Sequence, residues 1–299
     1  MSLQATLVSS LLRRFVKASE DKPLTANVRK ARAAMEQMGR VVPKPPRDVQ
    51  VASVDAGGVP AEWLTAPRSR SDRVVLYLHG GYYVAGSPRS HRNLTWRLAQ
   101  QADARVLALD YRLAPEHPYP AALEDVLRAH RWLIDQGISR IAWAGDSAGG
   151  GLAFSALHAA REAGLAAPCA IAAISPWTDL AGAGPSWTSN KERDPSTTTE
   201  SLRHAAALYC GSVPTDHPGV SPAYASFEAA PPVLIHVGEL EVLVDDAQTI
   251  AARLRAAGAP VEVRVWPSVP HVWHLLAPYL PESITATREI AAFLQRHWA

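Results

Sequence analysis

The sequence predicts an α/β fold with a mostly parallel central sheet and helices on both of its faces. Short apolar runs alternate with helical segments along most of the chain, and three of these helical segments end at a glycine, as helices often do. In addition, 299 residues with a hydrophobic fraction of 47% are enough for one large core. Apolar strands that are joined by helical crossovers form a parallel sheet that is buried on both sides.

The composition excludes several classes of function. The 30 basic and 28 acidic residues give a net charge of +2, which offers no electrostatic footprint for nucleic acid or for an anionic membrane. Cys169 and Cys210 form no CxxC pair, so we expect two small buried hydrophobic side chains and no metal or redox site. No apolar stretch reaches the roughly 18 residues of a membrane span, and the N-terminus lacks a signal-peptide pattern. We therefore expect a mature cytoplasmic protein without stable membrane insertion.

Residues 1–45 are predicted to form a small helical module. An amphipathic helix is expected over residues 1 to about 20, because apolar residues recur there at four-residue spacing: Leu3, Leu7, Leu11 and Phe15. A second helix is expected near Thr25 to Met38. Three prolines in VVPKPPR (41–47) stop this helix and form a stiff linker to the rest of the chain.

After the linker the pattern is that of strands and crossover helices. The segment 49–67 alternates in polarity around Gly57-Gly58, which predicts an antiparallel hairpin. Six further strands are expected at 74–80, 104–111, 138–145, 169–175, 232–238 and 261–267. Helices are expected at 93–103, 121–137, 149–164 and 245–258. One gap, from about 178 to 230, is rich in Pro, Ser, Thr and Gly with a helical patch near Thr199 to Tyr209, and we interpret it as an excursion over the sheet edge.

The most informative motif is Gly145-Asp146-Ser147-Ala148-Gly149, a G-x-S-x-G pattern between a predicted strand and a predicted helix. A nucleophile elbow requires this context. A serine on such a turn has a strained backbone, and bulky side chains two residues before or after it would collide, so glycines at both places relieve the crowding. A glycine-rich phosphate loop is the alternative, but the chain has no G-x-x-x-x-G-K-[ST] motif.

A second glycine-rich loop provides what a serine nucleophile needs. His79-Gly80-Gly81-Tyr82 leaves an earlier predicted strand, and its glycines allow backbone N–H groups to approach a carbonyl oxygen closely. Together with the N–H of Ala148, this loop would form an oxyanion hole. We predict Gly80, Gly81 and Ala148 as the donors, and the choice between Gly80 and Tyr82 beside Gly81 stays open.

Four motifs now stand together: HGGYYVAGS (79–87), DYRLAPEHPYPAALED (110–125), GDSAGG (145–150) and SPWTDL (175–180). With them the chain resembles the hormone-sensitive-lipase family of α/β-hydrolase esterases, of bacterial carboxylesterase type. The resemblance implies an α/β-hydrolase catalytic domain over residues 46–299, a helical cap from residues 1–45, and a second cap contribution from about 178–230. It implies neither a metal nor an organic cofactor. Tyr82 stands where the family usually has a third glycine, so its side chain would narrow the pocket or favour particular acyl groups.

We predict His271 as the general base. It follows the last predicted strand on a loop at its carboxyl end, and in α/β hydrolases the histidine comes last in the chain order. His274, three residues further on, is the alternative and is expected in the following helix. His236 lies in the middle of a predicted strand and is expected to be structural.

The acid that orients the histidine should follow the strand 232–238. The resemblance aligns the family's Asp-Pro-Leu-x-Asp with residues 241–245, which implies Glu241 as the catalytic acid. Either carboxylate type can hold an imidazole in the required tautomer. Asp245 remains the alternative acid, since it could instead cap the next helix.

Further charged and aromatic residues are interpreted structurally. Asp110, Arg112 and Glu116 are expected to form ion pairs that brace the active-site loops, as the resemblance implies. Asp146, beside the nucleophile, is expected to point away from it and stiffen the elbow. Trp177 is expected where a cap meets the pocket, as is Trp187.

Together these predictions describe a serine carboxylic-ester hydrolase that forms an acyl-enzyme. The resemblance implies small-molecule esters of short to medium chain length as substrates, no nucleic-acid partner is expected, and a homodimer stays open. Three alternatives remain: an amidase or other acyl hydrolase on the same fold, a non-catalytic ligand-binding relative, and a lipase that docks on a membrane through the helix at Leu3–Val16.

Overall fold

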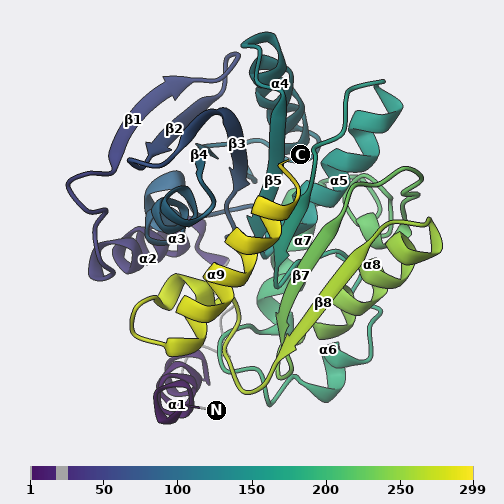
Figure 1. Cartoon of the computed structure of the whole chain (residues 1–299). Helices are drawn as coiled ribbons and strands as arrows, with labels where there is room; N and C mark the ends of the chain where they lie inside the picture. The colour runs from purple at the N-terminus through teal and green to yellow at the C-terminus, as the bar shows by residue number, and fades with distance from the viewer. Residues whose placement is uncertain (1, 18–25, 299) are drawn as a thin grey trace.

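The fold is a twisted sheet with helices on both faces, as the sequence predicts (Figure 1). The structure is a computed structural model that describes residues 2–17 and 26–298. Within these residues the sheet has eight strands in the order β1-β2-β4-β3-β5-β6-β7-β8. The strands are β1 Gln50–Asp55, β2 Pro60–Thr65, β3 Arg70–Leu78, β4 Ala104–Leu109, β5 Arg140–Asp146, β6 Ile171–Ile174, β7 Val233–Gly238 and β8 Val261–Trp266.

The predicted hairpin is present as β1 and β2, and β2 pairs antiparallel with β4, while the pairs from β4 across to β8 are parallel. Strand β3 begins at Arg70, four residues before the apolar run, because Arg70 pairs with Ala104 ahead of a register shift. The helices are α1 Leu3–Lys17, α2 Val28–Val41, α3 Pro88–Gln101, α4 Ala121–Asp135, α5 Ala148–Glu162, α6 Ser186–Ser189, α7 Thr199–Cys210, α8 Val244–Ala256 and α9 Pro281–Arg296, with short 3-10 turns η2 Pro222–Tyr224 and η3 Trp273–Leu276.

Several helix boundaries differ from the predicted ones, most of all the start of α3. Helix α2 ends at Val41, beyond the predicted Met38, and the predicted start at Thr25 lies outside the described residues. Helix α3 starts at Pro88, five residues before the predicted start. It does so because the Ser87 hydroxyl accepts a 3.1 Å hydrogen bond from the N–H of Ser90 and caps the helix.

The core consists of two apolar layers on opposite sides of the sheet. Along β3, Val74 and Leu76 face the layer under α4, α5 and α8, whereas Val75 and Tyr77 face the layer under α3 and α9. All four side chains are fully buried. A strand with both faces buried is apolar throughout, which is why these runs could be recognised in the sequence.

The parallel strands bring several loops to one edge of the sheet. Leu78 at the end of β3 pairs with Gly145, and Asp146 at the end of β5 pairs with Ile174. The last residue of β7, Gly238, pairs with Trp266 of β8. Ligands of open α/β sheets bind outside these carboxyl ends, so the loops that follow these strands are where a site is expected.

The segment 178–230 is an excursion that builds no strand within the described residues. Its helix α7 packs against the loop after β3, because the ring of Tyr209 stacks on that of Tyr83 with 3.7 Å between their centroids. The carbonyl of Tyr209 also accepts a 2.8 Å hydrogen bond from the N–H of Tyr119. Among the described helices, none is long and apolar enough to cross a membrane.

One arginine attaches helix α2 to the loops that follow β3 and β4. The Nε of Arg32 donates to the carbonyl of Val84 at 2.8 Å, and its Nη2 donates to the carbonyl of Ala114 at 3.1 Å. The same guanidinium forms a two-pronged ion pair with Glu116, with distances of 2.9 and 2.6 Å. The planar fork of arginine makes all four contacts at once.

We expect Arg32→Ala to lower the free energy of unfolding by about 1–3 kcal/mol, since it removes a charged donor from several acceptors. Arg32→Lys should recover only part of this loss, because an ammonium group cannot match the fork. Urea unfolding followed by circular dichroism measures both values. Equal stability of the wild type and Arg32→Ala would contradict this role of Arg32.

Candidate active site

Ser147 sits on a strained turn between β5 and α5. Its backbone angles are φ 52° and ψ −120°, in the region that L-residues rarely adopt, and its side chain is buried. A Cβ on Gly145 would lie 2.5 Å from the carbonyl oxygen of Gly149, and one on Gly149 would lie 2.0 Å from that of Leu78. Both glycines are therefore required by close backbone packing, as the motif predicts.

The loop after β8 brings His271 to this serine. Its Nε2 lies 2.9 Å from the Oγ of Ser147, which is hydrogen-bond distance for proton transfer. The N–H of His271 donates to the Oγ of Ser196 at 3.0 Å, so the excursion holds the loop from outside. The next residue, Val272, is in a left-handed conformation with φ 51°, which turns the chain sharply into η3.

Glu241, on the turn between β7 and α8, holds the other side of the imidazole. Its Oε2 lies 2.6 Å from the Nδ1 of His271, and its Oε1 accepts hydrogen bonds from the Oγ of Ser175 at 2.8 Å and from the N–H of Gly238 at 2.6 Å. The Glu241 carboxylate is completely buried, so these donors replace its hydration.

The charge around His271 favours its protonated form. Burial alone would lower the pKa of His271, but three carboxylates outweigh burial and raise that pKa above its usual value. Glu241 contributes most of this effect, and Asp194 and Asp146 add to it. An imidazole in this environment is a strengthened base toward the Ser147 hydroxyl.

The structure does not place the alternative residues at the serine. Asp245 accepts a hydrogen bond from the N–H of Ser186 at 2.6 Å instead of contacting His271. His274 lies in η3, and its Nε2 is 3.1 Å from the Nδ1 of His236. Burial lowers the pKa of both histidines of this pair, which fits the structural role expected for His236.

The loop after β3 carries two of the predicted oxyanion donors, Gly80 and Gly81, and the alternative donor Tyr82. The N–H of Gly80 donates to the Oδ1 of Asp146 at 3.1 Å, so this N–H is already occupied. Gly81 and Tyr82 have positive φ angles of 125° and 60°, and their N–H groups have no hydrogen-bond partner within the part of the chain that the structure describes. The sequence could not reveal the hydrogen bond at Gly80, because this bond depends on the direction of the Asp146 side chain.

Asp146 points away from Ser147, as expected, into a buried polar cluster. Its Oδ1 also accepts from the hydroxyl of Tyr77 at 2.6 Å, and its Oδ2 lies 3.3 Å from the Nε2 of His91. Burial opposes both charges, but their attraction prevails, so the pKa of His91 is raised and the pKa of Asp146 is lowered. This buried ion pair ties α3 to the elbow.

Of the three charged residues after β4, Arg112 and Glu116 form ion pairs as expected, whereas Asp110 forms none among the described residues. Arg112 contacts Asp125 through its Nη2 at 2.9 Å, and Glu116 pairs with Arg32. Trp177 and Trp187 are both buried. The side chain of Trp177 meets the edge of Tyr82, with 6.5 Å between ring centroids, which places it beside the loop after β3.

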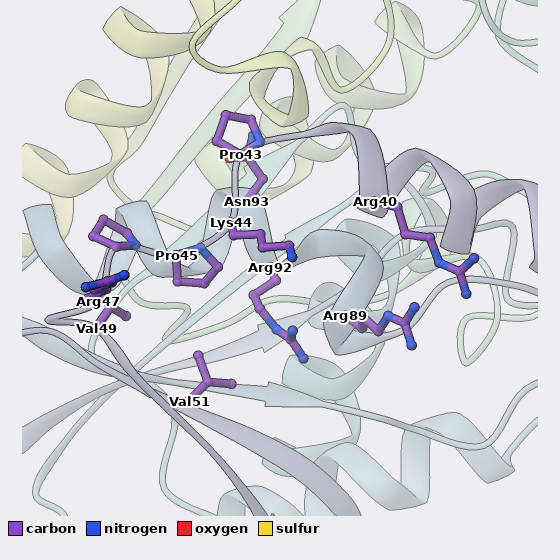
Figure 2. A pocket seen from close by; sticks show the side chains of 12 residues that line it. Arg40, Pro43, Lys44, Pro45, Arg47, Val49, Val51, Arg89, Arg92 and Asn93 are labelled. Carbon is purple, nitrogen blue, oxygen red and sulfur yellow. The ribbon is translucent and has the colours of Figure 1, made fainter.

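A separate cavity of about 610 Å³ lies between α2, the proline-rich linker and α3 (Figure 2). Its lining includes Arg40, Lys44 and Arg92 but none of the residues around Ser147. The guanidinium of Arg92 already pairs with Glu62. In the described residues no group of three His, Cys, Asp or Glu side chains could hold a metal ion.

Three residues around Ser147, His271 and Glu241 were not singled out from the sequence. Ser175 lay within the SPWTDL motif, which was the available signal, and its hydroxyl contacts Glu241. Asp194 and Ser196 lie in the excursion, where nothing in the local pattern distinguishes them. Their partners lie far along the chain: Ser196 accepts a hydrogen bond from the N–H of His271, 75 residues away, and Asp194 accepts one from the N–H of Val242, 48 residues away.

The chain is similar to several known proteins. A sequence profile for the alpha/beta hydrolase fold matches residues 75–275. An acetyl-hydrolase of Streptomyces hygroscopicus is 46% identical, with 84% of this chain and 83% of the relative aligned. An ethyl acetate hydrolase of Pseudomonas putida is 34% identical, covering 84% and 82%.

Solved structures extend the likeness to the whole chain. An esterase from the bacterial hormone-sensitive lipase family has a TM-score of 0.94 and 42% identity, covering 100% of this chain and 99% of the other. The esterase EstE5, from a crystal soaked with p-nitrophenyl butyrate, has a TM-score of 0.92 and 37% identity at the same coverage. The chain belongs to the α/β-hydrolase fold family, in its hormone-sensitive-lipase group, and is an enzyme of the esterase type.

We expect Asp146→Asn to lower the free energy of unfolding by about 3 kcal/mol, since it leaves His91 buried without its partner. The loss should depend on pH. The raised pKa of His91 stabilises the fold fully below its usual 6.5 and fades as pH rises, whereas the lowered pKa of Asp146 stabilises it only above the usual 3.8.

The difference in stability between wild type and Asp146→Asn should therefore be largest between about pH 4 and 6.5 and shrink at higher pH. Urea titrations at closely spaced pH values measure it. A difference that stays constant from acidic to alkaline pH would show that the ion pair is not the source of the stability.

Proposed function

We propose that this chain is a serine carboxylic-ester hydrolase that works through Ser147, His271 and Glu241 and forms an acyl-enzyme. One observation carries the proposal. His271 bridges the other two residues: its Nε2 lies 2.9 Å from the Ser147 hydroxyl and its Nδ1 lies 2.6 Å from the Glu241 carboxylate. This arrangement has the geometry of a nucleophile, a general base and an orienting acid.

The mechanism follows from these roles. The Oγ of Ser147 attacks the ester carbonyl as the Nε2 of His271 takes its proton, and Glu241 stabilises the imidazolium without becoming protonated. The same imidazole then protonates the departing alcohol. Water activated by His271 attacks the acyl-enzyme, the Ser147 oxygen leaves with a proton, and the carboxylic acid is released.

We assign the oxyanion hole to the N–H groups of Gly81, Tyr82 and Ala148. The first two have no other partner among the described residues, and Ala148 is the first residue of α5, where the helix leaves its N–H groups unbonded. The positive end of the helix dipole adds to the stabilisation of the developing oxyanion. Tyr82 can serve because the donor is its backbone and not its side chain.

We propose short acyl chains as the preferred substrates. The partly buried ring of Tyr82 occupies space beside Trp177 that a glycine would leave open. The names of the acetyl-hydrolase and ethyl acetate hydrolase relatives support the same size class. Residues 46–299 would form the catalytic domain, and residues 1–45 with the excursion at about 178–230 would cover the site as a cap.

Ser147→Ala should lower kcat on p-nitrophenyl esters by roughly 10⁴-fold or more, because it removes the nucleophile. Ser155→Ala, at a buried serine further along α5 whose hydroxyl has no partner within the described chain, is the matched control and should keep full activity. Steady-state kinetics on folded variants measures the effect. Full turnover by Ser147→Ala would refute the mechanism.

Glu241→Gln should lower kcat by roughly 10³- to 10⁴-fold, because a neutral amide no longer stabilises the imidazolium. Asp245→Asn should change kcat only slightly, since Asp245 holds the N–H of Ser186, which an amide oxygen can also accept. If Asp245→Asn were the crippled variant, the assignment of Glu241 would fail. Parallel rates on matched ester and amide substrates distinguish an esterase from an amidase with the same triad.

Tyr82→Gly should shift the preference toward longer acyl chains, because it removes a ring from the pocket and places the residue best suited to φ 60° at this position. The measurement is kcat/KM for p-nitrophenyl acetate, butyrate, hexanoate and octanoate. We expect the octanoate to acetate ratio to rise about tenfold, which corresponds to little more than one kcal/mol. An unchanged ratio would mean that Tyr82 does not limit the pocket.

A further inference from the structure

A buried carboxylate of the excursion connects two segments of the site. We call them the acid turn, which carries Glu241 between β7 and α8, and the base loop, which carries His271 after β8. Asp194 is only 5% exposed. Its Oδ2 accepts a 3.0 Å hydrogen bond from the N–H of Val242, the residue after Glu241. Its Oδ1 accepts from the N–H and the hydroxyl of Ser196, at 2.9 and 3.2 Å, and the Ser196 hydroxyl in turn accepts from the N–H of His271 at 3.0 Å.

A turn that Asp194 merely caps would look different. Capping explains the bonds from the N–H groups of Ser196 and Thr197, both 2.9 Å long. Capping does not explain why the second carboxylate oxygen accepts a hydrogen bond from the N–H of Val242, which follows Glu241 and lies 48 residues after Asp194. A carboxylate that only capped an exposed turn would stay hydrated, so its charge would carry no desolvation cost.

The same excursion grips the acid turn at a second point. The side-chain amide of Asn190 donates to the carbonyls of Glu239 and Glu241, at 3.1 and 2.9 Å. Together with Asp194, it fixes both ends of this turn from outside the sheet. Because a misplacement of about 1 Å can cost a hundredfold in rate, such bonds bear directly on the alignment of Glu241 with His271.

Asp194 also acts through its charge. The groups that set the charge around His271 come from three elements: Glu241 on the turn after β7, Asp194 on the excursion and Asp146 on the elbow. Asp194 itself is influenced by Glu241, by His271 and by the phenol of Tyr82. Burial, followed by the Glu241 carboxylate, raises the pKa of Asp194 to about 6, so it is ionised at neutral pH and above.

We propose that Asp194 is a positioning residue for ester hydrolysis, which sets the acid turn against the base loop through Val242 and Ser196 and places a second buried negative charge beside His271. The proposal rests on the function assigned to Ser147, His271 and Glu241. Asp194 does not contact the reacting atoms. Asp194 acts through His271, because it holds the loop that carries His271 and makes this imidazole a stronger base.

The decisive experiment is the pH profile of kcat/KM for p-nitrophenyl butyrate with Asp194→Asn, because its acid limb reports the free enzyme's base. Removing the charge should move this limb to lower pH by about half a unit to one unit. It should also lower kcat at neutral pH by about tenfold, since the amide cannot accept all the bonds that Asp194 accepts. A purely structural role would lower activity without moving the limb.

Two further variants separate geometry from charge. Ser196→Ala removes the acceptor for the N–H of His271 but no charge, so it should lower kcat by about tenfold and leave the limb and KM in place. Glu192→Gln removes an exposed carboxylate two residues from Asp194 and should match the wild type in both respects. Circular dichroism and thermal unfolding confirm that each variant is folded.

A folded Asp194→Asn with the wild-type limb and a kcat within about twofold of wild type would overturn the proposal. If this variant does not fold, Asp194→Ser, which keeps one acceptor without the charge, is judged by the same limb and the same criterion. The triad is tested separately by Ser147→Ala. An inactive Ser147→Ala beside an unshifted Asp194→Asn would leave the esterase mechanism in place and refute only the role of Asp194.

Discussion

The close approach of α5 to the end of β3 is the constraint on which the whole site depends. A side chain at Gly149 would lie 2.0 Å from the carbonyl oxygen of Leu78, so only glycine lets the helix begin so near the sheet. The chain must then reverse within a single residue, and Ser147 takes the strained angles φ 52° and ψ −120°. Packing around the turn compensates for this strain. The hydroxyl then lies at the N-terminus of α5, where the positive end of the helix dipole is located. Backbone contact thus places Ser147, and strand register brings His271 and Glu241 to it.

The buried carboxylates of Asp146 and Glu241 have different roles because they have different partners. Asp146 is held by Tyr77 and His91 and stabilises the turn beneath the serine, whereas Glu241 has two donors on one oxygen and His271 on the other. In a low-dielectric interior each of these charges would be costly without its donors. With them, the same charges make the imidazole of His271 a better proton acceptor than it would be if burial acted alone. The polar network is thus both a structural and an electrostatic device.

The sequence predicted those features that local pattern determines. Strands with both faces buried read as apolar runs, and the G-x-S-x-G motif between strand and helix located Ser147, because both signals arise within a few residues. The start of α3 was predicted too late because a short stretch around Ser87 and Pro88 reads as a loop until its hydroxyl is seen to cap the helix. The choice between Gly80 and Tyr82 as a donor stayed open for a related reason: the tertiary fold brings the Asp146 side chain to the N–H of Gly80. Asp194 carried no signal, since its bond to the acid turn joins it to Val242, 48 residues further along the chain.

The N-terminal helix adjoins the same network. The guanidinium of Arg13 on α1 donates a 2.9 Å hydrogen bond to the carbonyl of Arg193, the residue before Asp194. The N–H and hydroxyl of Ser2 bond to Glu282 at the start of α9. A helix that covers a site must be attached to it, and here one attachment lies a single residue from the carboxylate that spans the acid turn and the base loop. The proposed cap is therefore attached to the chain segment that also contacts the acid turn and the loop of His271.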